Sequence, residues 1–246
     1  MKYVATVSYL GQGYSGFQRQ RNGLKSIQGE LERALSFALG VETQIKGAGR
    51  TDAGVNALGQ RVSFVSERPL DENFINLWNH LLPLDIQVTK IDTCPDSFDA
   101  RHSSIGKVYE YCFAIKGRNP FEVGRLTQLE AERFDKTLFE KSLRCFEGEH
   151  DFRCFTTKPQ DKDNFVRVVE PIQILWSEDG NIGRIVLKSN GFMTYQIRLM
   201  MGVAFKIAMG RLPESKIPEL LSSKTRKIAS FKAAPDGLYL VEVLYE

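Results

Sequence analysis

The sequence has few residues of the kinds that bind metals or carry redox chemistry. It contains three histidines and four cysteines in 246 residues. No two cysteines have the CxxC spacing, and the scattered histidines form no metal-ligand cluster with them. No glycine motif typical of nucleotide cofactors is present either. We therefore expect free thiols in a reducing compartment, and the sequence predicts no metal and no cofactor.

Long apolar runs are also missing. The first residues, MKYVATVSYLG, alternate in polarity and do not have the layout of a signal peptide. The most apolar helical stretch, 192–209, is interrupted by Gln196, Arg198 and Lys206, which argues against a membrane-spanning helix. We expect a soluble, cytoplasmic protein with no membrane partner.

The sequence lacks a strong excess of either charge. The formal net charge is +3, which permits an anionic partner without requiring one. Hydrophobic residues make up 42% of the chain, enough for a substantial core. The length suits one large domain or two of ordinary size.

The hydrophobic pattern predicts strands and helices mixed in both halves of the chain. Strands are expected at 2–10, 42–48, 59–66, 85–93, 107–115, 166–176, 182–189 and 238–244. Helices are expected at 27–39, from Asp71 to Pro83, and at 129–145, 192–209 and 214–222. We predict an α+β fold of two similar subdomains, 1–102 and 103–246. Their mainly antiparallel sheets join around a central cleft, with helices on the outer face.

The densest chemical signal is GAGRTDAGVNALGQ at 47–60. Four glycines surround Arg50, Thr51 and Asp52 in this segment. Glycines let the backbone approach a ligand closely, and the short carboxylate of Asp52 would be held on a rigid loop. The alternative is a structural turn in which Asp52 only accepts hydrogen bonds from the next backbone amides.

Two segments in the second half contain further candidates. Tyr109 lies at a loop-to-strand junction in DARHSSIGKVYEY, at 99–111, and its alternative role is that of a half-buried strand aromatic. Arg198 lies among apolar residues in GFMTYQIRLMMG, at 191–202. A buried charge needs a carboxylate partner or a wet cleft, unless the side chain extends into solvent.

Together these segments resemble the TruA family of tRNA pseudouridine synthases, along essentially the whole chain. The matching segments are YSGFQRQ (14–20), GRTDAGVNALGQ (49–60), LLPLDI (81–86), FDARHSSIGKVYEY (98–111), YQIRLMMG (195–202) and GLYLVEV (237–243). The resemblance implies that Asp52 is the catalytic aspartate and that Arg50 helps to hold a flipped-out nucleotide. It implies that Tyr109 stacks on the target base and that Arg198 pairs with the catalytic carboxylate.

The resemblance also extends to the substrate-side loop, where Arg19 and Gln20 match a segment that contacts the RNA. The sequence departs from the family at two positions. Asn56 stands where the family usually has histidine, and His102 stands where many members have an aromatic residue. These departures bear on the selection of RNA sites rather than on the reaction.

The implied reaction isomerises uridine to pseudouridine in the anticodon stem-loop of tRNA, at positions 38, 39 and 40. The enzyme would act as a homodimer with tRNA in the cleft. A carboxylate at Asp52 could attack C6 of uracil, attack C1′ of ribose or remove the C2′ proton. The alternatives are a non-catalytic RNA-binding protein on the same scaffold and a nucleosidase-like hydrolase.

Basic residues recur in several of the predicted loops. As a set they would supply contacts to RNA phosphates, although for each alone a solvated surface charge is the simpler explanation. The set consists of Arg19, Arg21, Lys25, Arg61, Arg101, Lys107, Lys224, Arg226 and Lys227.

Overall fold

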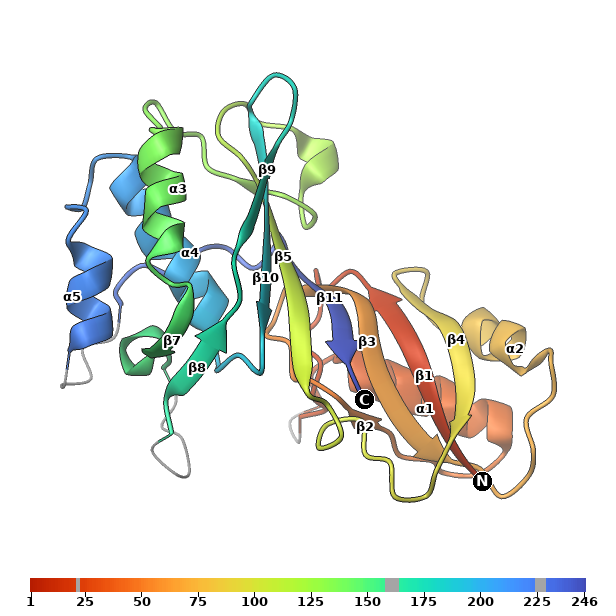
Figure 1. The fold of residues 1–246 in the computed structure, drawn as a ribbon. Coiled ribbons are helices and arrows are strands. Elements are labelled where there is room, and N and C mark those ends of the chain that lie inside the picture. The colour runs from red at the N-terminus through yellow and green to blue at the C-terminus, as the bar shows by residue number, and fades with distance from the viewer. Residues whose placement is uncertain (21–22, 158–163, 224–228) are drawn as a thin grey trace. The chain divides into compact units, whose positions relative to one another are not determined.

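Each half of the chain contributes its own strands and helices, and the strands belong to one sheet. The structure is a computed structural model that describes residues 1–20, 23–157, 164–223 and 229–246. One unit contains residues 1–105 together with 239–246, and the other contains residues 106–238 (Figure 1). The two units are described separately below.

The sheet of the first unit is built around a central antiparallel pair. Its strands are β1 (Lys2–Tyr9), β2 (Lys46–Gly47), β3 (Asn56–Val65), β4 (Ile86–Cys94) and β11 (Leu238–Leu244). β1 pairs antiparallel with both β3 and β4, and β2 pairs antiparallel with β3. β11 pairs parallel with β3, in the register Tyr239 to Asn56. The end of the chain therefore completes the first unit.

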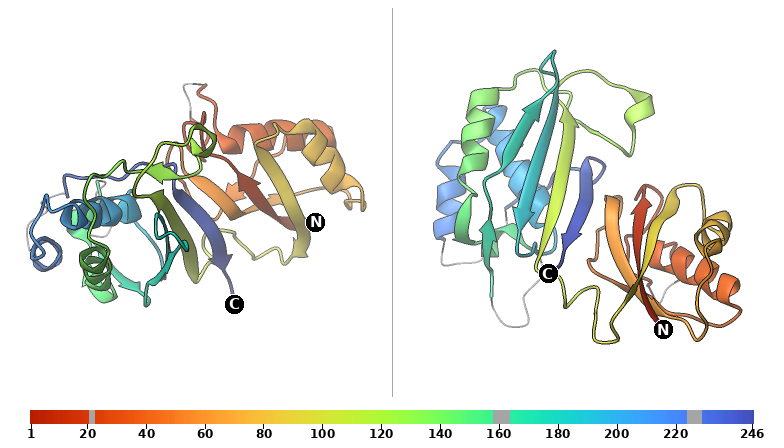
Figure 2. Two further views of the ribbon diagram at one scale, coloured as in Figure 1. Left: turned by 90° about the horizontal axis from the view of Figure 1, so that it is seen from above. Right: turned by 45° about the vertical axis from the view of Figure 1, so that its right-hand side comes forward.

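Two helices lie on one side of this sheet (Figure 2). α1 (Ile27–Leu39) begins at Ser26, whose side chain accepts a hydrogen bond from the amide of Gly29, and it ends at Gly40 in the left-handed conformation. α2 (Phe74–Leu81) contributes the fully buried Trp78, which packs edge-on against Phe64 of β3. These contacts form the core of the unit.

In the second unit the helices lie on one side of the strands (Figure 1). Its strands are β5 (Gly106–Ala114), β6 (Thr127–Gln128), β7 (Gly148–Asp151), β8 (Val166–Val169), β9 (Gln173–Trp176) and β10 (Ile182–Ser189). β10 pairs antiparallel with β5, β8 and β9, and β7 pairs antiparallel with β8. The helices are α3 (Lys136–Arg144), α4 (Gln196–Ala208) and α5 (Lys216–Ser222), with 3₁₀ turns at Pro120–Glu122 and Arg153–Phe155.

Aromatic side chains fill the space between this sheet and its helices. Phe113 of β5 contacts Phe139 of α3 at 5.3 Å and Phe205 of α4 at 4.8 Å, between ring centroids. α4 is buried on almost every side, which explains its apolar sequence. None of the helices in the described ranges is long and apolar enough to cross a membrane.

The predicted fold class is confirmed: helices and a mostly antiparallel sheet mix in both halves. The helix predicted at 129–145 is wrong at its start, because Thr127–Gln128 forms a strand with β5 and Glu130 has a φ of 48°. That helix begins only after Asp135, whose side chain accepts a hydrogen bond from the amide of Leu138.

Other predicted boundaries also differ from the structure. The strand predicted at 42–48 is limited to Lys46–Gly47, and the strand at 166–176 is divided by residues 170–172, which include Pro171. The division predicted at residue 102 lies at residue 105 in the structure. The last strand, predicted in the second subdomain, groups with the first unit because it pairs with β3.

Candidate active site

Asp52 lies in a loop, residues 48–55, that connects β2 to β3; we call it the Asp52 loop. Its neighbour Thr51 is buried and is held from two directions. The Thr51 and Tyr9 hydroxyls share a hydrogen bond of 2.8 Å, and the amide of Phe17 donates to the Thr51 carbonyl at 3.1 Å. Asp52 itself is half-buried. The loop thus fixes the backbone on one side of a partly accessible carboxylate.

A second set of contacts fixes the start of the same loop. Gln60 is fully buried, and its carboxamide accepts from the amide of Gly49 at 3.2 Å and donates to the Gly49 carbonyl at 2.9 Å. It also donates to the hydroxyl of Tyr9 at 3.4 Å. Burial raises the pKa of Tyr9 to about 12, so its phenol stays protonated at neutral pH.

Two glycines allow the chain to pass close to Thr51 and to turn after Asp52. Gly54 has a φ of 78° in a turn closed by the amide of Val55, which donates to the Asp52 carbonyl at 3.1 Å. Gly16 has a φ of 97°, and a Cβ there would lie 2.9 Å from the carbonyl oxygen of Thr51. Gly54 therefore permits the turn after Asp52, and Gly16 permits close backbone packing against Thr51.

The other candidates in the first unit lie on its surface. Arg50 is exposed. Arg19 is half-exposed and forms an ion pair of 3.1 Å with the buried Glu32 of α1. Gln20 is exposed and donates to the carbonyl of Ser15 at 2.9 Å. Arg19 and Gln20 thus have contacts within the protein, and their contact with RNA stays a prediction.

The two departures from the family pattern occupy different environments. Asn56 is fully buried, and its side-chain oxygen accepts from the amide of Gly11 at 2.8 Å. It therefore connects the start of β3 with the segment that follows β1. His102 is exposed, and its amide donates to the carboxylate of Asp99 at 3.0 Å.

Tyr109 in the second unit is a buried residue of β5, opposite Leu187 of β10. Its ring meets that of Phe192 edge-on, with centroids 5.4 Å apart. Phe192 follows β10 in the turn that leads to α4. The sequence pattern did not single out Phe192, because its contact with Tyr109 depends on tertiary packing.

Arg198 is buried on α4, with 8% of its surface exposed, so it does not extend into solvent. Its Nε donates to the carbonyl of Ala233 at 2.8 Å, and its guanidinium lies 5.4 Å from the ring centroid of Tyr195. Burial raises the pKa of the Asp236 carboxyl, and the positive charge of Arg198 opposes that shift. Arg198 and Asp52 belong to different units, and their pairing stays a prediction.

Tyr195 precedes α4 and has a φ of 63°, an uncommon conformation for a bulky residue. The ammonium of Lys232 lies 4.1 Å from the centroid of its ring, which Arg198 also contacts. Two cations thus share one aromatic ring. In the sequence, Tyr195 stands three residues before Arg198, and this position alone did not indicate a role for it.

The basic residues proposed as a set have varied surroundings. Arg61 donates to the hydroxyl of Thr6 at 2.6 Å, and Lys25 lies 4.6 Å from the ring centroid of Tyr14. Arg101 is exposed and Lys107 is half-buried. Arg21, Lys224, Arg226 and Lys227 lie outside the described residues. Within the described ranges, no group of three or more histidine, cysteine, aspartate or glutamate side chains is arranged to hold a metal ion.

The chain matches a family model, individual proteins and solved structures. The family model described as tRNA pseudouridine synthase matches residues 143–246. The tRNA pseudouridine synthases A of Streptococcus pneumoniae strains Hungary19A-6 and CGSP14 are each 35% identical over 253 residues, covering 100% of this chain and 99% of theirs. The solved archaeal box H/ACA sRNP Nop10–Cbf5 complex aligns with a TM-score of 0.38 and 15% identity, over 82% of this chain and 44% of that one.

The full-length match defines the class of the protein as a pseudouridine synthase, which is an isomerase. Within that class, the chain belongs to the tRNA pseudouridine synthase A family, which is the TruA family.

Replacing Gly16 by alanine tests the close packing against Thr51. Both Gly16→Ala and the control Gly13→Ala place alanine at a positive φ, which costs about 1–2 kcal/mol. Only at Gly16 does the new Cβ meet other atoms within 4 Å, namely the backbone of the Asp52 loop. We expect Gly16→Ala to slow single-turnover pseudouridine formation by roughly ten- to a hundredfold, with Gly13→Ala near the original rate. Equal rates in the two variants would contradict this packing role.

Replacing Tyr195 separates its ring contacts from its backbone conformation. Asparagine tolerates the left-handed conformation but has no ring, whereas phenylalanine keeps the ring. Cation–π contacts contribute about 0.5–2 kcal/mol. If the ring orients Arg198, Tyr195→Asn should slow single-turnover pseudouridine formation roughly two- to thirtyfold, and Tyr195→Phe should react at the original rate. A Tyr195→Asn protein with an unchanged rate would show that the ring does not orient Arg198.

Proposed function

We propose that this protein isomerises uridine to pseudouridine in transfer RNA, with Asp52 as its catalytic carboxylate. The observation that supports this most directly is the Asp52 loop. The residue before Asp52 is buried and hydrogen-bonded through both its hydroxyl and its carbonyl, while Asp52 stays partly accessible. A carboxylate that reacts with a substrate requires this combination of fixed backbone and access.

The reaction itself needs no atom from outside the substrate. The C1′–N1 bond breaks, the uracil turns, and a C1′–C5 bond forms, while the proton lost from C5 is balanced by one gained at N1. A single carboxylate can serve such a reaction as a nucleophile or as a base. Attack at C6, attack at C1′ and removal of the C2′ proton are the three routes that this proposal includes.

The remaining candidates bind and orient the nucleotide in this proposal. The target base must leave the helical stack, at a cost of a few kcal/mol. Stacking on Tyr109 would return about 1–3 kcal/mol, and Arg50 would hold the displaced nucleotide. Arg198 pairs with Asp52 and keeps that carboxylate ionised and oriented. Arg19 and Gln20 contact the RNA beside the site.

The proposed substrate is the anticodon stem-loop, with uridines 38, 39 and 40 as targets, and the proposed location is the cytoplasm. The names of the relatives support tRNA as the substrate class, while the positions and the compartment follow from the resemblance to the family alone. RNA of this size is recognised largely through its shape and backbone, which agrees with the scattered basic side chains.

Replacing Asp52 tests the proposed chemistry. We expect Asp52→Ala and Asp52→Asn to fold, to bind tRNA with near-normal affinity and to form no pseudouridine, because the proposed nucleophile or base is removed. Asp92→Asn is the control, since Asp92 is a carboxylate of the same unit whose ion pair, with Lys90, lies at the surface. The measurement is chemical labelling of pseudouridine, mapped along the tRNA after incubation with each protein.

The outcome also separates the alternatives. A non-catalytic RNA-binding protein would form no pseudouridine even without substitution. A hydrolase would release free uracil. Appreciable turnover by Asp52→Ala would exclude Asp52 as the catalytic residue, and pseudouridine found only outside the anticodon stem-loop would refute the assigned positions.

We also propose that the protein is a homodimer, with the tRNA lying across both subunits, as the resemblance implies. Sedimentation equilibrium at working concentration should then give a mass of about twice 27.9 kDa. A mass that stays at the single-chain value up to the concentration used for catalysis would contradict the dimer.

A further inference from the structure

Arg167 of β8 is a half-buried arginine that the reaction proposed above does not use. Its Nη1 donates to the carbonyls of Val166 at 2.6 Å and Asn164 at 3.2 Å. Burial lowers the pKa of the guanidinium below its usual value. Among the described residues no carboxylate forms an ion pair with Arg167, and Nε and Nη2 have no hydrogen-bond partner there. The edge of the guanidinium that binds anions with two parallel hydrogen bonds is therefore available.

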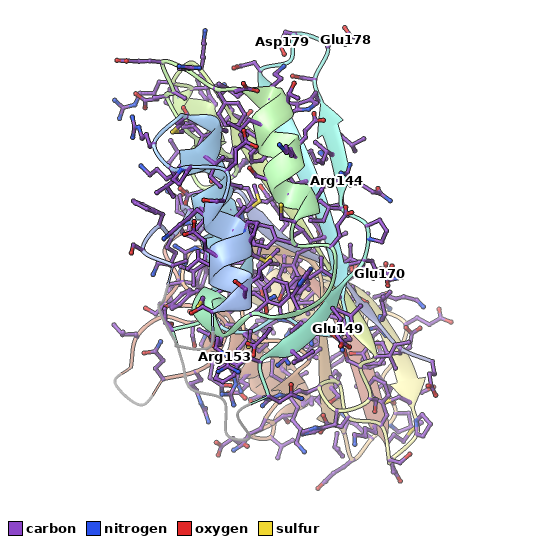
Figure 3. All side chains as sticks on the ribbon, turned by 60° about the vertical axis from the view of Figure 1, so that its left-hand side comes forward. Arg144, Glu149, Arg153, Glu170, Glu178 and Asp179 are labelled. Atoms are coloured by element: carbon purple, nitrogen blue, oxygen red, sulfur yellow. The ribbon has the colours of Figure 1, made fainter. Side chains whose placement is uncertain are left out.

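Three other arginines of this unit, at the end of α3, in the 3₁₀ turn after β7 and on β10, have carboxylate partners. Arg144 pairs with Glu147 at 2.6 Å, Arg153 pairs with Asp151, and Arg184 pairs with Glu110 at 3.3 Å. Figure 3 labels Arg144 at the end of α3, Glu149 on β7, Arg153 after β7 and Glu170 after β8. Glu170 pairs with Lys188, and Glu149 lies opposite Val168, on the other face from Arg167.

The strand register places Arg167 on the same sheet face as Tyr109. Ser189 of β10 lies opposite both Val169 of β8 and Lys107 of β5. Arg167 is two residues from Val169, and Tyr109 is two residues from Lys107, so all share one face. The burial of β8 agrees with this register: Val166 and Val168 are exposed, Arg167 is half-buried and Val169 is buried.

The turn after β10 brings Arg167 close to the aromatic pair. A Cβ on Gly191 would lie 4.0 Å from the Nε of Arg167. The next residue, Phe192, packs edge-on against Tyr109. The buried Ser189 hydroxyl donates to the Gly191 carbonyl at 3.0 Å, which fixes this turn. The Nε–Nη2 edge of Arg167 and the ring pair of Tyr109 and Phe192 thus lie beside the same turn, the one that follows β10.

We propose that Arg167 binds a backbone phosphate of the RNA strand, beside the nucleotide whose base contacts Tyr109. This rests on the proposed function, because it takes the ligand to be the RNA substrate. Guanidinium groups bind phosphate oxygens through paired hydrogen bonds, and partial burial strengthens the charge interaction. Aromatic rings combined with a cation that follows the backbone are the usual means of holding single-stranded nucleotides.

The test is tRNA binding measured by fluorescence anisotropy at several salt concentrations, for the unaltered protein, Arg167→Ala, Arg167→Lys and Arg184→Ala. Arg184 is the matched control, since it is an arginine of the same sheet that is paired with Glu110 on the opposite face. Arg167→Ala should bind about tenfold more weakly at low salt. Its plot of log affinity against log salt should be shallower by about one.

Arg167→Lys retains the charge but loses the paired hydrogen bonds. It should therefore keep the original slope and bind with intermediate affinity. Arg184→Ala should match the unaltered protein in slope. The proposal is overturned if Arg167→Ala and Arg184→Ala have the same slope and affinity. It is also overturned if Arg167→Ala only lowers the unfolding temperature, as expected of a residue that merely closes the start of β8.

These results are distinguishable from a failure of the proposed function. The function is measured by pseudouridine formed by the unaltered protein, and the role of Arg167 by the difference in salt slope. Pseudouridine formation with no slope difference would overturn the role of Arg167 alone. A slope difference without pseudouridine formation would overturn the enzyme assignment and leave the phosphate contact in place.

Discussion

The proposed active site depends on the hydrogen bonds that hold Thr51. The Tyr9 hydroxyl and the Phe17 amide, from β1 and from the segment before α1, meet at this one residue. Because Thr51 is buried, water competes little for either hydrogen bond. The adjoining Asp52 therefore has a defined backbone position before any substrate binds. Gln60 extends the arrangement to Gly49, so that β1 and β3 both support the loop.

In the second unit, two buried or half-buried arginines have different partners. Arg198 is buried, and its Nε donates to the Ala233 carbonyl while the Tyr195 ring lies beside its guanidinium. These contacts offset part of the cost of removing a guanidinium from water. They also fix its direction, which is what a residue proposed to orient a carboxylate requires. Among the described residues, Nε and Nη2 of Arg167 have no hydrogen-bond partner, which is what a residue proposed to bind phosphate requires. Burial and partners, rather than residue type, thus suggest different roles for two arginines.

Much of the fold could be predicted because local signals and tertiary structure agree. Ser26 and Gly40 mark both ends of α1, alternation identified β1, and a run of β-prone residues identified β5. The start of α3 was missed because Glu130 adopts a left-handed conformation that its sequence does not signal. The candidate site residues came from short motifs and family resemblance. Tyr9, Gln60 and Tyr195 were missed because their contacts join residues that lie on separate elements or depend on an unusual backbone conformation. No local pattern contains that information.

The most direct test of the central claim is a double-mutant cycle on the hydrogen bond between Tyr9 and Thr51, measured by the single-turnover rate of pseudouridine formation. Tyr9→Phe and Thr51→Val each remove one partner, so each should slow the reaction by roughly two- to tenfold. The double variant should be no slower than the slower single variant, because both substitutions remove the same contact. Rates equal to that of the unaltered protein, or effects that simply add, would contradict the claim that this hydrogen bond positions Asp52.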